Sequence, residues 1–200
     1  MPRAGLNTDR VVAEAAELAD EVGLDQLTLA ALAARLGVRQ PSLYKHVASI
    51  DALQRLISMR GKAELADVLG RAAIGKARDD ALVAIAHAWR AWALGHPGRY
   101  QAAERGAAPG DAEHEEVSRR TIEPMVAVMN GYGLDGEDAV DAIRAYRSAL
   151  HGFVSLEANY GFAFPESVDR SFGRLVHALV RALSSWRDVS EPGRAEVLGG

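Results

Sequence analysis

The sequence predicts an all-α fold in which a small N-terminal unit of three helices precedes a larger helical unit. Apolar residues recur at spacings of three and four along most of the chain, and alanine is abundant. No segment shows the alternation of apolar and polar residues that is typical of a strand. With 200 residues, the chain is long enough to build a second helical core.

The first two helices are marked by their caps. Asn7 or Thr8 can cap an N-terminal helix that Gly23 ends. Thr28 can cap a second helix of two turns, and Gly37 can adopt the left-handed conformation that terminates it. The apolar residues of this second helix lie on one face because they recur at three and four positions: Leu29, Leu32, Ala33 and Leu36.

A third, short helix follows the turn. Pro41 fits its first turn, where a backbone N–H is not needed. Leu43 and Val47 lie four residues apart and point inward, whereas Pro41 and Lys45 fall on the opposite side. The flanking positions are Ser42 and Tyr44. This is the layout of a helix-turn-helix, whose second helix presents a compact cationic face that fits the major groove of DNA.

The charge distribution separates this interpretation from a plain corner in a helical core. Residues 35–62 carry six basic residues and one acidic residue, a net charge of +5, whereas the whole chain has −4 and the remainder therefore −9. The basic residues are Arg35, Arg39, Lys45, Arg55, Arg60 and Lys62. A basic segment on an acidic protein indicates one face for nucleic acid.

The stretch LTLAALAARLGVRQPSLYKHVASIDALQRLI, residues 27–57, resembles the DNA-binding signature of the TetR-type bacterial transcriptional repressors. The resemblance implies that Thr28 and Tyr44 clamp phosphates, and that Gln40 and Lys45 approach base edges. It also implies that Pro41 touches a thymine methyl group. Backbone contacts are supported by Ser42 and His46. The predicted DNA-binding set is Thr28, Arg39, Gln40, Pro41, Ser42, Tyr44, Lys45 and His46.

Two positions depart from the family pattern. A basic residue is common two places after the capping threonine, where this chain has Ala30. A phosphate-binding lysine commonly starts the fourth helix, where this chain has Ile50. Fewer DNA contacts are expected from these two positions.

The later helices are expected from caps and breakers in the same way. Ser49 can cap a long helix that joins the two halves of the chain. A helix over about 78–94 follows, and residues 95–98 break it before a short helical piece through Tyr100. Residues 107–110 are expected to form a loop.

The last three helices follow that loop. Asp111 can cap a helix that Pro124 kinks and Gly131 helps to stop. The final two helices are expected over 135–160, capped by an aspartate, and 165–186, opened by a proline. The predicted organisation is a flexible tail (1–6), a helix-turn-helix DNA-binding domain (7–62), an effector-binding and dimerisation domain (63–188) and a flexible tail (189–200).

An apolar pocket with a few polar groups is predicted in the second domain. Its candidate lining residues are Trp89, Trp92, Tyr100, Met125, Met129, Tyr146 and His151. The stretches HAWRAWALGHPGRY and YRSALHGFVSLEANYGF resemble the ligand-binding domain of a TetR subgroup named for a WHG-type motif, matched here by Trp92 and by His151 with Gly152. The resemblance implies a small-molecule effector. Aromatic residues at helical spacing are also common in plain cores, and His151 fits either role.

A second apolar stripe runs along the last two long helices. Its residues are Ile143, Leu150, Phe153, Val154, Val168, Phe172, Leu175, Val176, Leu179, Leu183 and Trp186. Packing within the chain would account for it. Helix-turn-helix repressors, however, commonly bind two half-sites as two-fold dimers, and in the TetR family these helices form a four-helix interface. A homodimer through Tyr146–Tyr160 and Ser167–Trp186 is therefore expected.

The function predicted from these features is sequence-specific, ligand-responsive regulation of transcription. The chain is expected to act as a repressor that binds a palindromic operator in double-stranded DNA as a homodimer, and that a small apolar or aromatic effector releases. A metal-sensing regulator, an enzyme with a helical substrate pocket, and a module that binds proteins are the alternatives.

Other classes find little support in the sequence. No catalytic motif is present, His114 with its glutamate neighbours resembles a solvated helix start, and the chain has no cysteine, so no enzyme, cofactor or metal site is expected. The N-terminal MPRAGLNTDR lacks an apolar core, and no apolar run approaches the roughly 20 residues that cross a bilayer. A cytoplasmic protein without a membrane partner is predicted.

Overall fold

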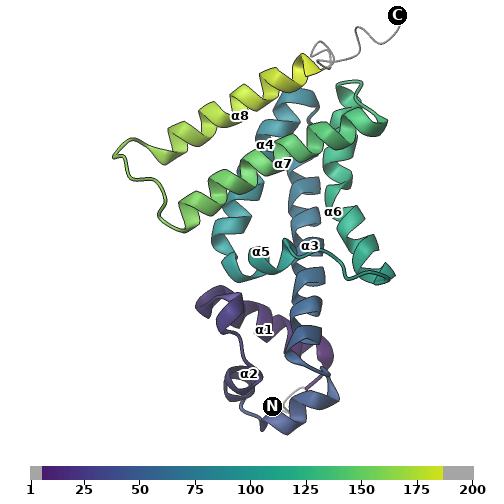
Figure 1. Ribbon diagram of the computed structural model, residues 1–200, viewed down its shortest axis with the longest axis vertical. Coiled ribbons are helices and arrows are strands. Elements are labelled where there is room, and N and C mark those ends of the chain that lie inside the picture. Colours follow the sequence, from purple (N-terminus) through teal and green to yellow (C-terminus); the bar gives the residue numbers. More distant parts are fainter. Residues whose placement is uncertain (1–5, 187–200) are drawn as a thin grey trace, which may run out of the picture.

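The computed structural model describes residues 6–186, and within them all regular structure is helical (Figure 1). The elements are α1 (Thr8–Val22), η1 (Leu24–Gln26), α2 (Leu29–Leu36), η2 (Gln40–Lys45), α3 (Ile50–Ala73), α4 (Arg78–Gly95), α5 (Pro97–Ala103), α6 (Ala112–Gly131), α7 (Gly136–Ala158) and α8 (Val168–Ser184), where η denotes a 3-10 helix. The expected all-α architecture is confirmed, with an N-terminal helix-turn-helix and a larger C-terminal helical part.

The N-terminal part, called the head below, forms its own apolar core. α1, α2, η2 and the start of α3 surround fully buried side chains such as Val11, Leu32, Leu43 and Leu53. This core ends along α3 at about Ile57. Figure 1 shows the head at the lower end of the molecule, with α3 rising from it as one continuous helix.

The larger part is built around the upper half of α3. α4, α6, α7 and α8 pack with it around Trp89, Tyr146 and Phe172, which are all almost fully buried. The core of this part begins on α3 at Leu65. Because one helix contributes to both cores, a displacement of α3 in the larger part changes the position of the head.

The short helix α5 is the second connection between the two parts. Its Ala102 belongs to the core of the head. Gly98 lies so close to α1 that an added Cβ would stand 2.1 Å from the Ala19 carbonyl oxygen, a distance that only glycine permits. Next to it, Asp20 accepts hydrogen bonds from the Arg99 backbone N–H (2.8 Å) and from Arg99 Nε (2.6 Å).

Most of the expected caps are present. Asn7, Thr28, Ser49 and Asp111 each accept a hydrogen bond from the backbone N–H three residues ahead. Gly37 adopts the left-handed conformation at the end of α2, with φ of 66°. The aspartate expected to cap α7 occupies the N-cap position, but its side chain accepts no capping hydrogen bond.

Two local expectations need correction. The last helix begins at Val168 and not at Pro165, because the Ser167 hydroxyl caps it by accepting from Arg170 N–H. The second helix of the helix-turn-helix is a 3-10 helix over its six residues. As expected, α6 contains Pro124 and ends at Gly131, and Pro124 packs near Gly70 of α3.

The predicted tails lie almost entirely outside the described residues. Leu6 is the exception, since it packs partly buried against the core of the head. Residues 189–200 fall outside the description. Within residues 6–186 no helix has the length and apolar character needed to cross a membrane.

Candidate nucleic-acid interface and ligand cavities

The helix η2 is anchored by its apolar side and presents its polar side to solvent. Leu43 and, just beyond the helix, Val47 are buried in the head, as their spacing predicts. Tyr44 is 53% exposed, and Ser42 and His46 are half-buried at the edge. The other exposed members of the predicted DNA-binding set on this surface are Arg39, Gln40, Pro41 and Lys45.

Hydrogen bonds to the oxygens of Thr28 and Tyr44 leave both hydroxyl groups able to donate to phosphates. Thr28 Oγ1 accepts from Ala31 N–H at 3.1 Å, so its hydroxyl hydrogen is directed outward and can donate. Gln40 Nε2 donates to the Tyr44 hydroxyl oxygen at 3.5 Å, which leaves the phenol hydrogen available to a phosphate. Thr28 and the η2 surface both lie on the exposed side of the head.

The charge argument from the sequence needs correction, because most of the basic residues in 35–62 have partners inside the protein. Arg35 binds three glutamates of α1: Glu14, Glu17 and Glu21. Arg55 binds Asp111 and Glu113 at the start of α6, and Arg60 binds Glu64. Lys62 is buried. Within residues 6–186, Arg39 and Lys45 are the basic residues of this segment that remain exposed without an ion pair.

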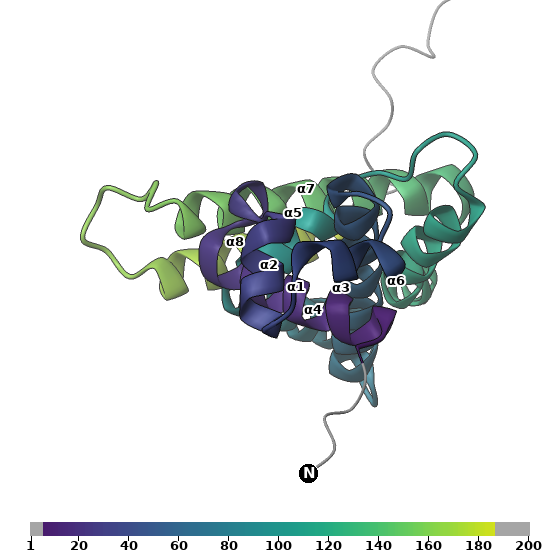
Figure 2. The same cartoon turned by 90° about the horizontal axis from the view of Figure 1, so that it is seen from below.

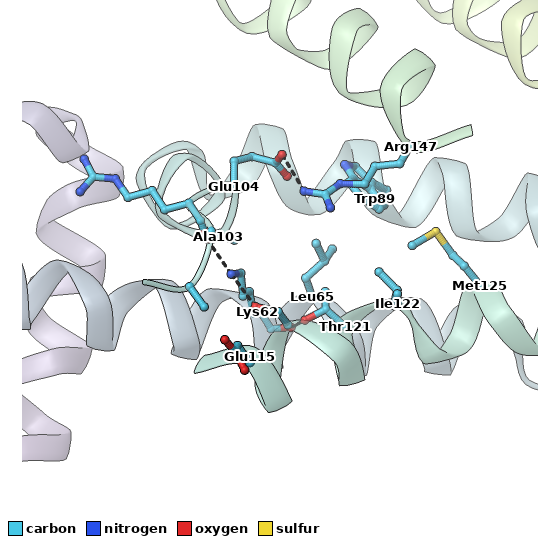
Figure 3. Close-up of a pocket in the computed structure, with 14 residues that line it drawn as sticks. Lys62, Leu65, Trp89, Ala103, Glu104, Glu115, Thr121, Ile122, Met125 and Arg147 are labelled. Atoms are coloured by element: carbon cyan, nitrogen blue, oxygen red, sulfur yellow. Dashed lines mark hydrogen bonds and ion pairs between the residues drawn. The ribbon is translucent and has the colours of Figure 1, made fainter. Parts of the chain in front are cut away.

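Two of the cavities in the larger part lie near the head. The first, called the Lys62 cavity, has a volume of about 310 Å³ and is formed by α3, α4, α6, α7 and the segment after α5. Its lining includes Lys62, Leu65, Trp89, Glu104, Ser118, Thr121, Ile122, Met125 and Arg147 (Figure 3). The second, the His151 cavity, has about 520 Å³ and is lined by residues that include Tyr100, Glu104, His151, Val154 and Asn159.

The predicted pocket residues divide between these cavities and the core. Trp89 and Met125 line the Lys62 cavity, and Tyr100 and His151 line the His151 cavity. Trp92, Met129 and Tyr146 line neither cavity and are buried in the core. The Tyr146 hydroxyl donates to the Leu82 carbonyl oxygen at 2.5 Å, so its polar group is satisfied within the core.

Tyr100 stands between the two cavities. Its hydroxyl oxygen accepts from Trp89 Nε1 at 3.2 Å and lies 2.8 Å from His151 Nδ1. Burial raises the pKa of Tyr100 above its ordinary value. Glu104 lines both cavities, and its carboxylate pairs with Arg147 at 2.9 Å. A ligand in either cavity would therefore contact a group that also borders the other.

The sequence interpretation missed a buried polar cluster between α3 and α6. His114, interpreted as part of a solvated helix start, is only 3% exposed, and its Nε2 lies 2.8 Å from Lys62 Nζ and 3.1 Å from Ser58 Oγ. A signal was present, because Ser58 and Lys62 fall on the same helical stripe as the apolar Leu65 and Leu69. Polar residues on a buried stripe indicate an internal cluster.

Comparisons with known proteins agree with this architecture. The model described as "Bacterial regulatory proteins, tetR family" matches residues 11–57, and the model described as "Tetracyclin repressor-like, C-terminal domain" matches residues 82–179. An uncharacterized HTH-type transcriptional regulator of Mycobacterium tuberculosis is 43% identical over 155 residues, which cover 77% of this chain and 71% of that protein. The chain belongs to the TetR family of bacterial transcriptional regulators.

Two further relatives extend the TetR-family match over nearly the whole chain. An uncharacterized HTH-type transcriptional regulator of Bacillus subtilis is 33% identical, with coverage of 91% of this chain and 95% of that protein. The crystal structure of a TetR variant from Acinetobacter baumannii in complex with minocycline superposes with a TM-score of 0.70 at 26% identity, with coverage of 94% and 100%. The chain is thus a DNA-binding, ligand-responsive transcriptional regulator and not an enzyme.

TetR-family regulators act as dimers, and α7 and α8 carry the surface predicted for this purpose. Most of the apolar stripe that motivated the prediction packs within the chain, since Ile143, Leu150, Phe172 and Val176 are buried. The outward surface of these helices includes small and apolar residues: Ala145, Ser148, Gly152 and Leu156 on α7, and Ala178 and Ala182 on α8. Charged residues such as Arg144, Arg174 and Arg181 are exposed beside them.

Proposed function

We propose that this TetR-family regulator is a repressor that binds a palindromic operator as a homodimer and leaves it when a small molecule enters the larger part. The DNA-binding unit covers residues 7–62 and the effector-binding and dimerisation unit residues 63–188, with the boundary inside α3. The observation that carries the proposal is the η2 surface, whose polar side chains are exposed while Leu43 and Val47 fix the helix to the head.

On DNA, the η2 surface would supply both base and phosphate contacts. Lys45, Gln40 and Pro41 are exposed; the first two would approach base edges, and Pro41 would meet a thymine methyl group. Tyr44, Thr28 and Arg39 would bind phosphates. Ser42 and His46 support backbone contacts from the edge of the surface. With Ala30 and Ile50 in place of basic residues, the interface relies on these few side chains.

The two cavities are the candidate effector sites, and α5 offers a route from them to the head. Ala103 at the end of α5 lines the Lys62 cavity, while Pro97 and Tyr100 line the His151 cavity. The same helix contacts α1 through Gly98 and through the bond between Arg99 and Asp20. A ligand that displaces α5 would therefore shift α1 and the spacing of the two heads in the dimer.

For the dimer we propose the outward surface of α7 and α8 together with the segment that joins them. That segment projects beyond the rest of the molecule (Figure 2). Two of its aromatic residues are strongly exposed, Tyr160 at 96% and Phe164 at 82%. Exposed aromatic side chains of this kind are enriched at protein interfaces. A second copy that covers them, with its own segment on the first, forms a two-fold contact.

The DNA assignment is tested by Lys45→Ala and Tyr44→Phe. Each variant should weaken binding to a selected operator by about 1–3 kcal/mol, or roughly 5- to 150-fold, while folding and dimerisation stay intact. Lys76→Ala is the matched control, because Lys76 is equally exposed but lies in the α3–α4 loop, away from the head. Fluorescence anisotropy with labelled operator measures all three. Equal affinities of the η2 variants and the control would refute the assignment.

A further inference from the structure

Lys62 is a buried cation whose neighbours are all neutral. It is 6% exposed, and its Nζ donates to the Arg105 carbonyl oxygen at 2.7 Å and to Ser118 Oγ at 2.8 Å. The third neighbour is His114 Nε2, at 2.8 Å. Within residues 6–186 no carboxylate lies within ion-pair distance of Lys62. Buried charges in proteins are ordinarily paired, so an ammonium group in this position is unusual.

The surroundings do not supply the missing negative charge. Burial, and then the charge of Lys62, lower the pKa of His114, so the imidazole is neutral and accepts from the ammonium group. Two carboxylates line the cavity, those of Glu104 and Glu115, and neither forms an ion pair with Lys62 (Figure 3). Glu104 is instead paired with Arg147. Burial and the charge of Arg147 lower the pKa of Lys62. A bound anion beside Lys62 would stabilise its charged form and so oppose both causes of the lowered pKa.

The Lys62 cavity has a polar end and an apolar end. Lys62 and Glu104 lie at one end and Met125 at the other (Figure 3). Leu65, Ile122 and Trp89 complete the apolar lining. Its volume of about 310 Å³ is at the lower limit of the range of small-molecule sites, which begins at roughly 300 Å³. A suitable occupant is small, with an anionic head and an apolar body.

We propose that the Lys62 cavity binds a small amphipathic carboxylate, whose acid group accepts a hydrogen bond from Lys62 Nζ and whose apolar body packs against Leu65, Trp89 and Met125. This inference rests on the ligand-responsive role proposed above and names the chemical class of the effector.

Binding of a carboxylate would also weaken a contact between the cavity and the head. An ammonium group has three donors, and the Arg105 carbonyl, Ser118 and His114 occupy all of them. A carboxylate must replace one of these acceptors. Arg105 is the most consequential, because its side chain donates to Gln54 Oε1 at 2.6 Å, on the stretch of α3 that packs in the head. Release of its carbonyl loosens the segment that ties the cavity to α3.

The test compares acids with their amides in direct binding to the full chain. Octanoate and phenylacetate are each titrated beside octanamide and phenylacetamide by isothermal titration calorimetry. At least one acid should bind about tenfold or more tightly than its amide. Lys62→Met, which keeps the length and apolar stem of the side chain, should remove this preference. The matched control Lys76→Met should retain it, since Lys76 is far from the cavity.

Each result decides the inference. Equal affinities of acids and amides, no binding of either acid at concentrations up to about 5 mM, or an acid preference that persists in Lys62→Met would overturn it. Lys62→Gln, which keeps a hydrogen-bond donor for the Arg105 carbonyl oxygen and Ser118 but removes the charge, is the second variant if Lys62→Met unfolds, and it should also remove the preference for acids. Binding of the wild type to operator DNA without ligand is measured separately. If the wild type does not bind, the proposed DNA-binding role is refuted, whereas the carboxylate site is judged by the calorimetry.

Discussion

The ion pair between Arg55 and Asp111 joins the lower half of α3 to the start of α6. Both carboxylate oxygens are engaged, with Arg55 Nε at 2.5 Å from Oδ2 and an Arg55 terminal nitrogen at 2.6 Å from Oδ1. Asp111 also caps α6 by accepting from His114 N–H. The hydrogen bond with Arg55 is the main reason that the pKa of Asp111 falls to about 2.

This shift predicts a contribution to stability that is lost at low pH. Because the folded pKa of Asp111 is below the ordinary value of 3.8, the ion pair stabilises the fold fully above about pH 4 and loses its effect as the pH falls toward 2. Asp111→Asn keeps a capping side chain but removes the charge. Its melting temperature should be lower at pH 7, and should fall less than that of the wild type between pH 5 and pH 2.

Glu113→Gln serves as the control for this experiment. Glu113 binds the same guanidinium group but is largely exposed, so its removal should change little. Circular dichroism melts across the pH range measure all three proteins. Parallel acid profiles of wild type and Asp111→Asn would show that the pair contributes nothing to folding.

Single residues were predictable where the physical rule is local. Thr28 and Ser49 were identified as caps because the capping hydrogen bond reaches only three residues along the chain. Lys62 and His114 were not, since the partners lie 52 residues apart and only the fold brings them together. The same reason explains why Arg35 and Arg55 were counted with the DNA-binding face although their partners are carboxylates of distant segments.

Among the elements, α5 lies in a position that requires glycines at its contacts, above all Gly98 against α1 and also Gly61 of α3 against the Arg99 carbonyl oxygen. At Gly98 any Cβ would collide with the α1 backbone at Ala19 and Asp20, and neither of these atoms can move aside as a flexible side chain could. The element is short, and its contacts with α1 and α3 hold it between the head and the cavities.

Gly98→Ala should therefore separate α5 from α1. Overpacking of this kind costs about 1–3 kcal/mol, which corresponds to a fall in melting temperature of roughly 2–12 °C for a chain of this size. Gly95→Ala, three residues earlier, is the control, because an added Cβ there meets no atom within 4 Å. Thermal unfolding should distinguish the two; similar melting temperatures would contradict the close approach of α5 and α1.

The extents of the elements were predictable to within a few residues where a cap or a glycine stands at the boundary. α1 ends at Val22 before Gly23, and α2 ends at Leu36 before Gly37. The start of α8 was misplaced because proline and serine are both good starting signals, and the Ser167 hydroxyl is the one that bonds to the helix. α6 runs through Pro124 to Gly131, as expected, and packs against α3.

At the scale of the molecule, binding of a dimer to a palindromic operator requires two heads held at a fixed spacing. Gly152 stands on the outward surface of α7, with open space where its side chain would be. Gly152→Arg should leave the protomer folded, since nothing in the chain is displaced, but should place a charge inside the proposed dimer contact. Sedimentation velocity at micromolar concentration should then change from dimer to monomer.

Ala63→Arg on the exposed side of α3 is the control for dimerisation, and it should sediment as the wild type does. A Gly152→Arg variant that remains a dimer would show that the subunits associate through another surface. A wild type that sediments as a monomer would refute the proposed homodimer.

The general architecture followed from the sequence because helical periodicity and capping are local, and because the helix-turn-helix occupies one continuous stretch. The cavities did not follow in detail. Of the predicted pocket residues, Trp89, Met125, Tyr100 and His151 border a cavity. Trp92, Met129 and Tyr146 lie in the core, because the side of a buried helix that borders empty space depends on how the neighbouring helices pack.

The most direct measurement is the selection of DNA fragments from a random pool by the purified protein, followed by sequencing of the bound fraction. We expect enrichment of a two-fold-symmetric motif whose half-site centres lie one or more helical turns apart, at multiples of about 10 base pairs. Loss of the enrichment in Lys45→Ala would accompany it. A bound fraction with the composition of the starting pool, or a motif that Lys45→Ala selects equally well, would refute sequence-specific DNA binding through the η2 surface.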